Sequence, residues 1–343
     1  MRFFLLAAIV VLLVSCAPGT PFKLSVDGDL LILGDGETIE IAVAPSQGGE
    51  LAGLSFPVAG HLEELLYRAR DYSEQPGWRG KAPLLWPATG RSILPTGEMN
   101  RYVLDNSALD MPMHGFARSS AWQLTDTEVA ENYAAVTVSL EDSPASRAVY
   151  PFGFSISAEY RVSPSALDIN YEVTAATDNE DVMPFSIGNH ITLELPLVTG
   201  SDPAATTFQG NLDQRFVTDE QRTFTGDIVA SPFVGAQRVD ALPRRLAVSL
   251  GSPESVPEIL VRDASGLAVS IAHEILAGTA VEAIDFNLWA DLEEGFFSPE
   301  PWIGTQNSLN SGAGLVHLAP GKSWRWQIRI RPHAGTPGEF DNE

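Results

Sequence analysis

The sequence is poor in cysteine and in positive charge, and both shortages exclude classes of protein. Cys16 is the only cysteine among 343 residues, so no disulfide can form within the chain. Only 21 lysines and arginines stand against 44 aspartates and glutamates, and the formal net charge is −23. This charge argues against nucleic acid or anionic lipid headgroups as partners. Because it is spread along the chain, it favours a solvated acidic surface that tolerates a neutral ligand.

Long apolar runs are also scarce. The run from Phe3 to Val14 is shorter than the about 20 residues that span a bilayer. With the basic start and Leu13-Val14-Ser15-Cys16, it resembles a bacterial lipoprotein signal. We therefore expect a signal peptide at 1–15, lipidation of Cys16 and a tether at 16–22. Since Ala17 rather than aspartate follows, we expect an outer-membrane protein of the bacterial envelope that faces the periplasm and contacts the membrane only through this anchor. An ordinary signal peptide with an incidental cysteine is the alternative.

Repeats, low-complexity linkers and strong amphipathic helices are absent as well. The 29 glycines and 24 prolines mark many turns, which predicts many short strands. We expect one all-β domain at 23–332, built as two packed antiparallel sheets, and a flexible tail at 333–343. The predicted strands include 30–33, 38–43, 84–87, 134–140, 246–250, 267–271, 284–289 and 324–331. Residues 63–69 fit a helical turn or a strand equally well.

The stretch from Tyr150 to Pro196 has the clearest pattern. Residues 154–162 and 167–173 alternate between apolar and polar side chains, which predicts two strands with one buried face each. An apolar approach then leads to Gly188-Asn189-His190. A histidine at the mouth of a sheet is a candidate acid or base. A half-buried, hydrogen-bonded structural histidine is the alternative.

A second candidate is Glu300, which stands between Pro299 and Pro301 after two phenylalanines. Prolines fix the local chain, and the aromatic neighbours can desolvate the carboxyl group and raise its pKa. Both effects suit a general base near neutral pH. A surface glutamate in a proline turn is the alternative. Two further polar motifs are Gly90-Arg91 and Met113-His114-Gly115-Phe116-Ala117-Arg118.

In their order and spacing, these motifs resemble the aldose 1-epimerases (galactose mutarotases), and within them the branch related to hexose-phosphate epimerases. The resemblance extends from about Ser46 to Arg331. It rests on residues 82–91, 112–118 with Trp122, 150–152, 184–190 and 300–304. It implies a large twisted antiparallel β-sandwich with a concave sugar-binding face. Ile191 and Thr192 stand where the family often has a proline and an aromatic residue.

The resemblance also implies roles. His190 would protonate the ring oxygen of a sugar, and Glu300 would remove the proton of its anomeric hydroxyl. Arg91 and His114 would bind the substrate, and Arg118 would brace the His114 loop. Candidates for stacking on the sugar are Trp86, Trp289 and Trp302, of which Trp86 and Trp289 fit the core better. Candidates for an additional sugar-binding aspartate are Asp213 and Asp285. His61, His273, His317 and His333 match no motif.

The sequence therefore predicts an aldose 1-epimerase that acts on a free hexose or related aldose outside the cytoplasm. This chemistry needs an acid and a base but no metal, nucleotide, other cofactor or covalent intermediate. The alternatives are a non-catalytic carbohydrate-binding envelope lipoprotein and a structural envelope protein that uses the fold only as a scaffold.

Overall fold

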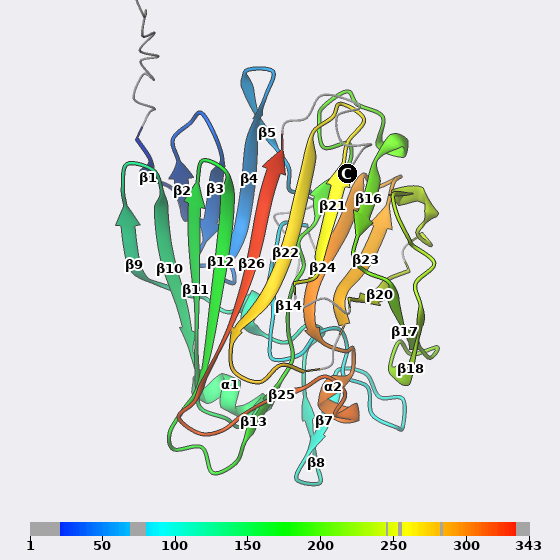
Figure 1. Ribbon diagram of the computed structural model, residues 1–343. Coiled ribbons are helices and arrows are strands. Elements are labelled where there is room, and N and C mark those ends of the chain that lie inside the picture. Colours follow the sequence, from blue (N-terminus) through cyan, green and yellow to red (C-terminus); the bar gives the residue numbers. More distant parts are fainter. Residues whose placement is uncertain (1–20, 69–79, 245, 253–255, 282–283, 334–343) are drawn as a thin grey trace, which may run out of the picture.

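The computed structural model describes residues 21–68, 80–244, 246–252, 256–281 and 284–333, which form an almost wholly β structure (Figure 1). The expected signal peptide, Cys16, most of the tether and residues 334–343 of the expected tail lie outside the described residues. No helix within the described residues is long and apolar enough to span a bilayer. Phe22, the last residue of the expected tether, is buried in the core.

The larger of two main sheets has nine antiparallel strands and lies across the front of the view in Figure 1. In spatial order, its strands are β19 (Gln237–Arg238), β16 (Thr207–Gly210), β21 (Glu258–Arg262), β22 (Ala268–Ala277), β26 (Ser323–His333), β12 (Ala166–Ala175), β11 (Phe154–Ser163), β10 (Ala134–Glu141) and β9 (Gln123–Val129). The alternating strands predicted around 154–173 are confirmed, because β11 and β12 bury every second residue. Period-2 alternation therefore gives this sheet one apolar face.

The second main sheet has eight strands. Its order is β18 (Phe224–Ala230), β17 (Gln214–Thr218), β20 (Val248–Gly251), β23 (Ile284–Asp291), β24 (Phe296–Gly304), β14 (Ile187–Asn189) and β6 (Leu84–Leu85), and β15 (Leu193–Glu194) also pairs with β24. A third sheet runs in chain order through β1 (Lys23–Asp27), β2 (Leu30–Gly34), β3 (Glu40–Ala44), β4 (Glu50–Val58) and β5 (His61–Glu64). Residues 63 and 64, the start of the stretch 63–69 that fits a helical turn or a strand, thus lie in strand β5.

Short elements complete the chain. Two small sheets pair β7 (Arg101–Leu104) with β8 (Ser107–Asp110), and β13 (Met183–Phe185) with β25 (Val316–Leu318). The helical turns are α1 (Pro144–Val149), α2 (Ser308–Ser311), η1 (Ala117–Ser119), η2 (Pro203–Ala205) and η3 (Val239–Ala241). Ser143 caps α1 through a reciprocal capping box, and Pro144 opens its first turn.

One continuous apolar core joins the layers. The third sheet packs against β10 and β11, and the eight-stranded sheet covers the other half of the nine-stranded one (Figure 1). His273 links the two main sheets, because its Nε2–H donates to the Asp285 carbonyl oxygen (2.8 Å) while Nδ1 accepts from Trp326 Nε1 (3.2 Å). Trp86 is fully buried against Phe154 and Tyr150, which confirms the core position expected for it.

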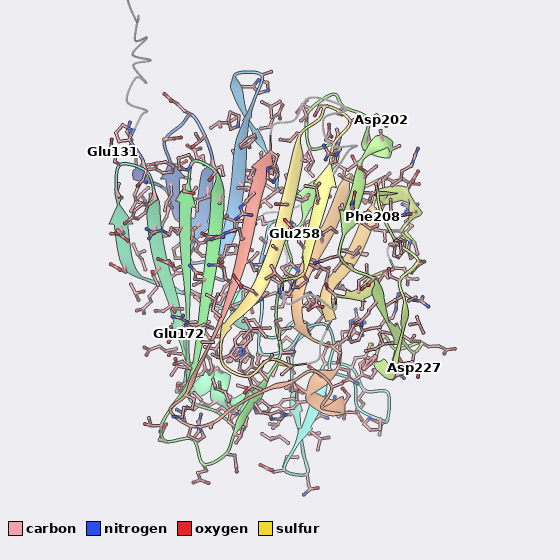
Figure 2. All side chains as sticks on the ribbon, in the orientation of Figure 1. Glu131, Glu172, Asp202, Phe208, Asp227 and Glu258 are labelled. Atoms are coloured by element: carbon pink, nitrogen blue, oxygen red, sulfur yellow. The ribbon has the colours of Figure 1, made fainter. Side chains whose placement is uncertain are left out.

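Acidic side chains are distributed over the whole molecule. Figure 2 labels Glu131, Glu172, Asp202, Asp227 and Glu258, which lie far apart on different strands and loops. The negative charge therefore forms a dispersed, solvated surface rather than one acidic tail.

Candidate active site

Glu300 lies in the middle of β24, whose nine residues are all buried. On one side, β23 places Asn287 opposite Glu300. On the other side, β14 pairs Gly188 with Trp302, and β15 pairs Leu193 with Phe297. Both pairings follow one register, so residues 189–192 face residues 298–301. His190 therefore stands opposite Glu300.

The two prolines explain why the segment between β14 and β15 forms no ladder of backbone hydrogen bonds with β24. Pro299 and Pro301 have no N–H to donate, and prolines are tolerated only where a strand lacks that hydrogen bond. Residues 189–192 form backbone hydrogen bonds along their other edge instead. His190 N–H donates to Pro83 O (3.0 Å), and Thr192 N–H donates to Lys81 O (2.9 Å). The Pro-Glu-Pro segment is thus a central strand, and the alternative of a surface turn is wrong.

The Glu300 carboxylate is 1% exposed and accepts two hydrogen bonds. Trp302 Nε1 donates to Oε2 at 3.1 Å, and Asn287 Nδ2 donates to Oε1 at 3.4 Å. Burial raises the pKa of Glu300 well above its ordinary value, and these two donors oppose the rise. Glu300 is therefore an unusually strong base held in one orientation.

The His190 ring is buried beside Glu300, with 3.6 Å between Nε2 and Oε1. On its other side, Nδ1 lies 3.3 Å from Thr192 Oγ1. Burial lowers the pKa of His190 to about 3, and the positive charge of Arg118 adds to this shift. The neutral ring is therefore strongly favoured in the absence of a ligand.

His114 approaches His190 edge-on, with 5.7 Å between the ring centroids. Its backbone is left-handed (φ 66°) and its N–H donates to Gly90 O (2.7 Å), while Gly90 N–H donates back to His114 Nδ1 (3.1 Å). Burial, together with the neighbouring His190, lowers the pKa of His114 well below its ordinary value. The neutral ring must carry its proton on Nε2, because Nδ1 is an acceptor. His114 is thus a fixed hydrogen-bond donor.

These groups line a cleft of about 610 Å³. The buried side is formed by His114, His190, Asn287, Glu300 and Trp302, with the partly exposed Trp289 beside them. The rim includes Arg91, Met99, Met113, Arg222 and Gln306. Arg91 is exposed, and its guanidinium lies against the sulfur atoms of Met113 (3.2 Å) and Met99 (3.4 Å). The size and mixed polarity suit a small polar ligand.

The structure brings most of the predicted site residues together. Arg91, His114, His190, Glu300 and Trp302 all line this cleft. The bracing contact expected of Arg118 is present, since its Nη2 donates to Met113 O (3.2 Å).

Three expectations differ from the structure. Trp289 lines the cleft rather than filling the core, because it is near the end of β23 and stays partly exposed, with its ring against Phe296 and His190. Asp285 does not line the cleft, because its Oδ2 is turned to the Ser252 N–H (2.7 Å). Asp213 is exposed and lies in a different hollow.

Asn287 and Thr192 were missed by sequence reasoning, although both contact the central pair. The available signal for Asn287 was alternation, since Asp285, Asn287 and Trp289 are spaced two apart in one strand. Thr192 had no such signal. Among the described residues, no cluster of His, Cys, Asp or Glu is arranged to hold a metal ion.

The profile of a family described as "Aldose 1-epimerase" matches residues 29–245, which include Arg91, His114 and His190. The chain belongs to the aldose 1-epimerase family. No curated protein shows significant sequence similarity to it. Its predicted membership of the hexose-phosphate-related branch stays a prediction.

Solved structures share the fold over nearly the whole chain. A galactose mutarotase-like protein from Clostridium acetobutylicum is 18% identical, with TM-score 0.73 and coverage of 91% of this chain and 98% of that one. A galactose mutarotase related enzyme from Lactobacillus acidophilus is 19% identical, with TM-score 0.71 and coverage of 92% and 98%. A galactose 1-epimerase from Lactobacillus acidophilus is 15% identical, with TM-score 0.64 and the same coverage of 92% and 98%. The predicted galactose mutarotase-like β-sandwich is thereby confirmed.

Proposed function

We propose that this protein is an aldose 1-epimerase that interconverts the α and β anomers of a free hexose or related aldose. The observation that carries the proposal is the placement of His190 Nε2 and Glu300 Oε1, 3.6 Å apart, at one cleft of a chain from this family. Mutarotation requires an acid and a base that reach the two oxygens of one anomeric carbon. Two adjacent groups of opposite function meet that requirement.

Ring opening uses the charged form of the pair. Glu300 carboxylate takes the proton of the anomeric hydroxyl, and the C1–O1 bond becomes the carbonyl double bond. The C1–O5 bond breaks, and O5 receives the proton from Nε2–H of the His190 imidazolium. The products are the open-chain aldehyde, a protonated Glu300 and a neutral His190.

Reclosure runs these steps backward after rotation about the C1–C2 bond. Neutral His190 takes the proton from the O5 hydroxyl, and Glu300 returns its proton to the carbonyl oxygen. Burial favours the neutral forms of both residues, which is their state while the aldehyde is present. The pair holds one proton throughout, so the cycle needs no proton from solvent.

The neighbouring residues supply orientation. His114 presents Nε2–H as a donor to a sugar oxygen, and Arg91 offers its guanidinium at the rim. Trp302 and Asn287 hold the Glu300 carboxylate by two hydrogen bonds. A free sugar fits the net charge of −23, which repels phosphorylated ligands.

Polarimetry tests the proposal. Freshly dissolved α-glucose and α-galactose are followed with and without the full-length protein. Faster approach to the equilibrium rotation is the expected result. Sugar binding without faster equilibration would contradict the proposed enzymatic activity. It would support the alternative of a non-catalytic carbohydrate-binding lipoprotein. Absence of both would overturn any role in sugar recognition.

We also propose that the protein is exported and held in the bacterial envelope by lipid on Cys16, facing the periplasm. The support is the sequence Leu13-Val14-Ser15-Cys16 after an apolar run, with Ala17 following. A sugar epimerase in that position would meet free extracellular sugars.

A further inference from the structure

Two buried hydroxyl groups lie behind His190 and play no part in the chemistry above. Thr192 and Ser298 are both 0% exposed. Thr192, in the segment between β14 and β15, faces Ser298 of β24 in the same register that sets His190 opposite Glu300. Their oxygens are 2.9 Å apart, and Thr192 Oγ1 also lies 3.3 Å from His190 Nδ1.

The hydrogen-bond distances favour one arrangement of the protons. Thr192 has one hydroxyl proton, and its shortest fixed acceptor is the His190 carbonyl oxygen at 3.0 Å. Ser298 then donates its own proton to Thr192 Oγ1. The remaining lone pair of Thr192 Oγ1 faces His190 Nδ1, so it accepts Nδ1–H. With Nδ1 protonated, the neutral ring has its lone pair on Nε2, the nitrogen next to Glu300.

The two histidines of the cleft are therefore held in opposite tautomers. At His114, a backbone N–H donates to Nδ1 and leaves the proton on Nε2. At His190, a hydroxyl accepts from Nδ1, so the proton that is gained and lost is the one on Nε2. One ring can only donate to the sugar, and the other can exchange a proton with it.

We propose that Thr192, oriented by Ser298, is a positioning residue that fixes His190 in the tautomer with Nδ1–H and Nε2 toward Glu300. Its relevance to turnover rests on the proposed epimerase function. A ring in the opposite tautomer would present Nε2–H to Glu300 while neutral, and could not accept the proton of the sugar O5 hydroxyl during reclosure.

The test combines a spectroscopic and a kinetic readout. Full-length protein labelled with ¹⁵N in histidine is compared as wild type, Thr192→Val and Thr192→Ser, and His190→Asn identifies the His190 signals. Thr192→Val keeps the shape but removes the acceptor, whereas Thr192→Ser keeps the hydroxyl. Thr174→Val is the matched control, because Thr174 forms a similar pair with Ser323 (2.8 Å) on an exposed part of the sheet.

The wild type and Thr192→Ser should show His190 with protonated Nδ1, and Thr192→Val should lose that preference. In polarimetry, Thr192→Val should lower kcat about 10- to 100-fold with little change in KM, less than the full contribution of a positioned acid. Thr192→Ser and Thr174→Val should stay close to wild type.

A wild-type His190 with unprotonated Nδ1 overturns the proposal, whether or not Thr192→Val folds. So does a folded Thr192→Val variant whose His190 spectrum is unchanged. If the wild type has Nδ1–H but does not accelerate mutarotation, the proposed function fails and the tautomer assignment stands.

Discussion

Burial acts in opposite directions on the two central side chains. It raises the pKa of Glu300 and lowers the pKa of His190, and each shift favours an uncharged group. Because the groups are adjacent, they titrate as a pair, and their apparent pKa values belong to the pair. A sugar oxygen placed against either group changes the relative stability of the charged and the neutral pair. Substrate binding can thereby move the proton between the two groups.

Arg91 at the rim and His114 on the buried side of the cleft should act mainly on binding. For Arg91→Ala and His114→Asn, we expect KM to rise about 3- to 10-fold, as for the loss of a hydrogen bond of about 0.5–1.5 kcal/mol, with a smaller loss of kcat. Asparagine is used at position 114 because it tolerates the left-handed backbone there. Initial rates over a range of sugar concentrations give both constants. A variant with wild-type KM would remove its residue from the binding surface.

Asp285 should affect stability rather than sugar binding. Burial raises the pKa of its carboxyl group to about 6 from 3.8, so the ionised form is disfavoured in the fold. The contribution of Asp285 to stability is then greatest below 3.8 and falls as pH rises toward about 6. Asp285→Asn should raise the free energy of unfolding by about 1–3 kcal/mol at pH 7 and by much less at pH 3.5, since one pKa unit is about 1.4 kcal/mol.

Chemical denaturation at the two pH values checks this prediction, and mutarotation rates provide the control. KM should not change, because Asp285 points away from the cleft. An equal gain in the free energy of unfolding at both pH values would contradict an origin in the ionisation of Asp285. A raised KM would indicate that Asp285 contributes to sugar binding.

The sequence could predict His190 and Glu300 as site residues but could not choose between Asp285 and Asn287. Both are polar and spaced two apart in one strand. A register shift between Ile284 and Phe286 precedes Asn287, and the side chain of Asp285 turns to Ser252. Such a bulge depends on the neighbouring strand, which local alternation does not describe.

At the scale of elements, β24 is the strand that sequence patterns describe least well. Two prolines normally argue against a central strand. Here they fall opposite residues 189–192, whose backbone bonds to Lys81 and Pro83 instead. That compensation involves segments more than 100 positions apart in the chain. By contrast, β11, β12 and β26 were predictable, because each alternates regularly against one core face.

Gly188 in β14 should be needed for the position of Trp302. A Cβ atom at Gly188 would lie 2.7 Å from Trp302 Cδ1 and 3.1 Å from Thr89 Cγ2, so Gly188→Ala must push the indole ring. The displaced ring would lose its hydrogen bond to Glu300. We expect kcat to fall about 10-fold or more, because hydrogen bonds to charged groups contribute about 1.5–3 kcal/mol.

Polarimetry and near-ultraviolet circular dichroism measure this effect. Trp302→Phe is the control, because it removes the same N–H without crowding the strand. A Gly188→Ala variant with wild-type kcat and an unchanged aromatic spectrum would show that the added methyl group does not displace the Trp302 indole ring.

At the scale of the whole molecule, the fold assembles a site from residues distant in the chain. Arg91, His114, His190 and Glu300 meet through the eight-stranded sheet and the loops beside it. The fold class was predictable from turns and alternation. The strand order was not, because β26 near the end of the chain lies between β12 and β22. The separate sheet of β1–β5 was likewise absent from the two-sheet expectation.

The position of the molecule in the cell gives a prediction at the same scale. If Cys16 is lipidated, Cys16→Ser should release the protein from the membrane fraction or block its processing. Cell fractionation and mass spectrometry of the mature amino terminus measure both outcomes. A wild-type protein that is exported, soluble and unlipidated would contradict the anchor.

Mutarotation by Glu300→Gln is the most direct measurement. Glutamine keeps the shape of the side chain and one of its two acceptor positions, but it is not a base. Because a positioned acid or base contributes about 10²–10⁴-fold, kcat should fall by that order while sugar affinity and fold survive. His190→Asn should have a similar effect, and the double variant should be little worse than the worse single one, since both groups serve one step. Glu300→Gln that equilibrates α-glucose or α-galactose at the wild-type rate would show that the base lies elsewhere.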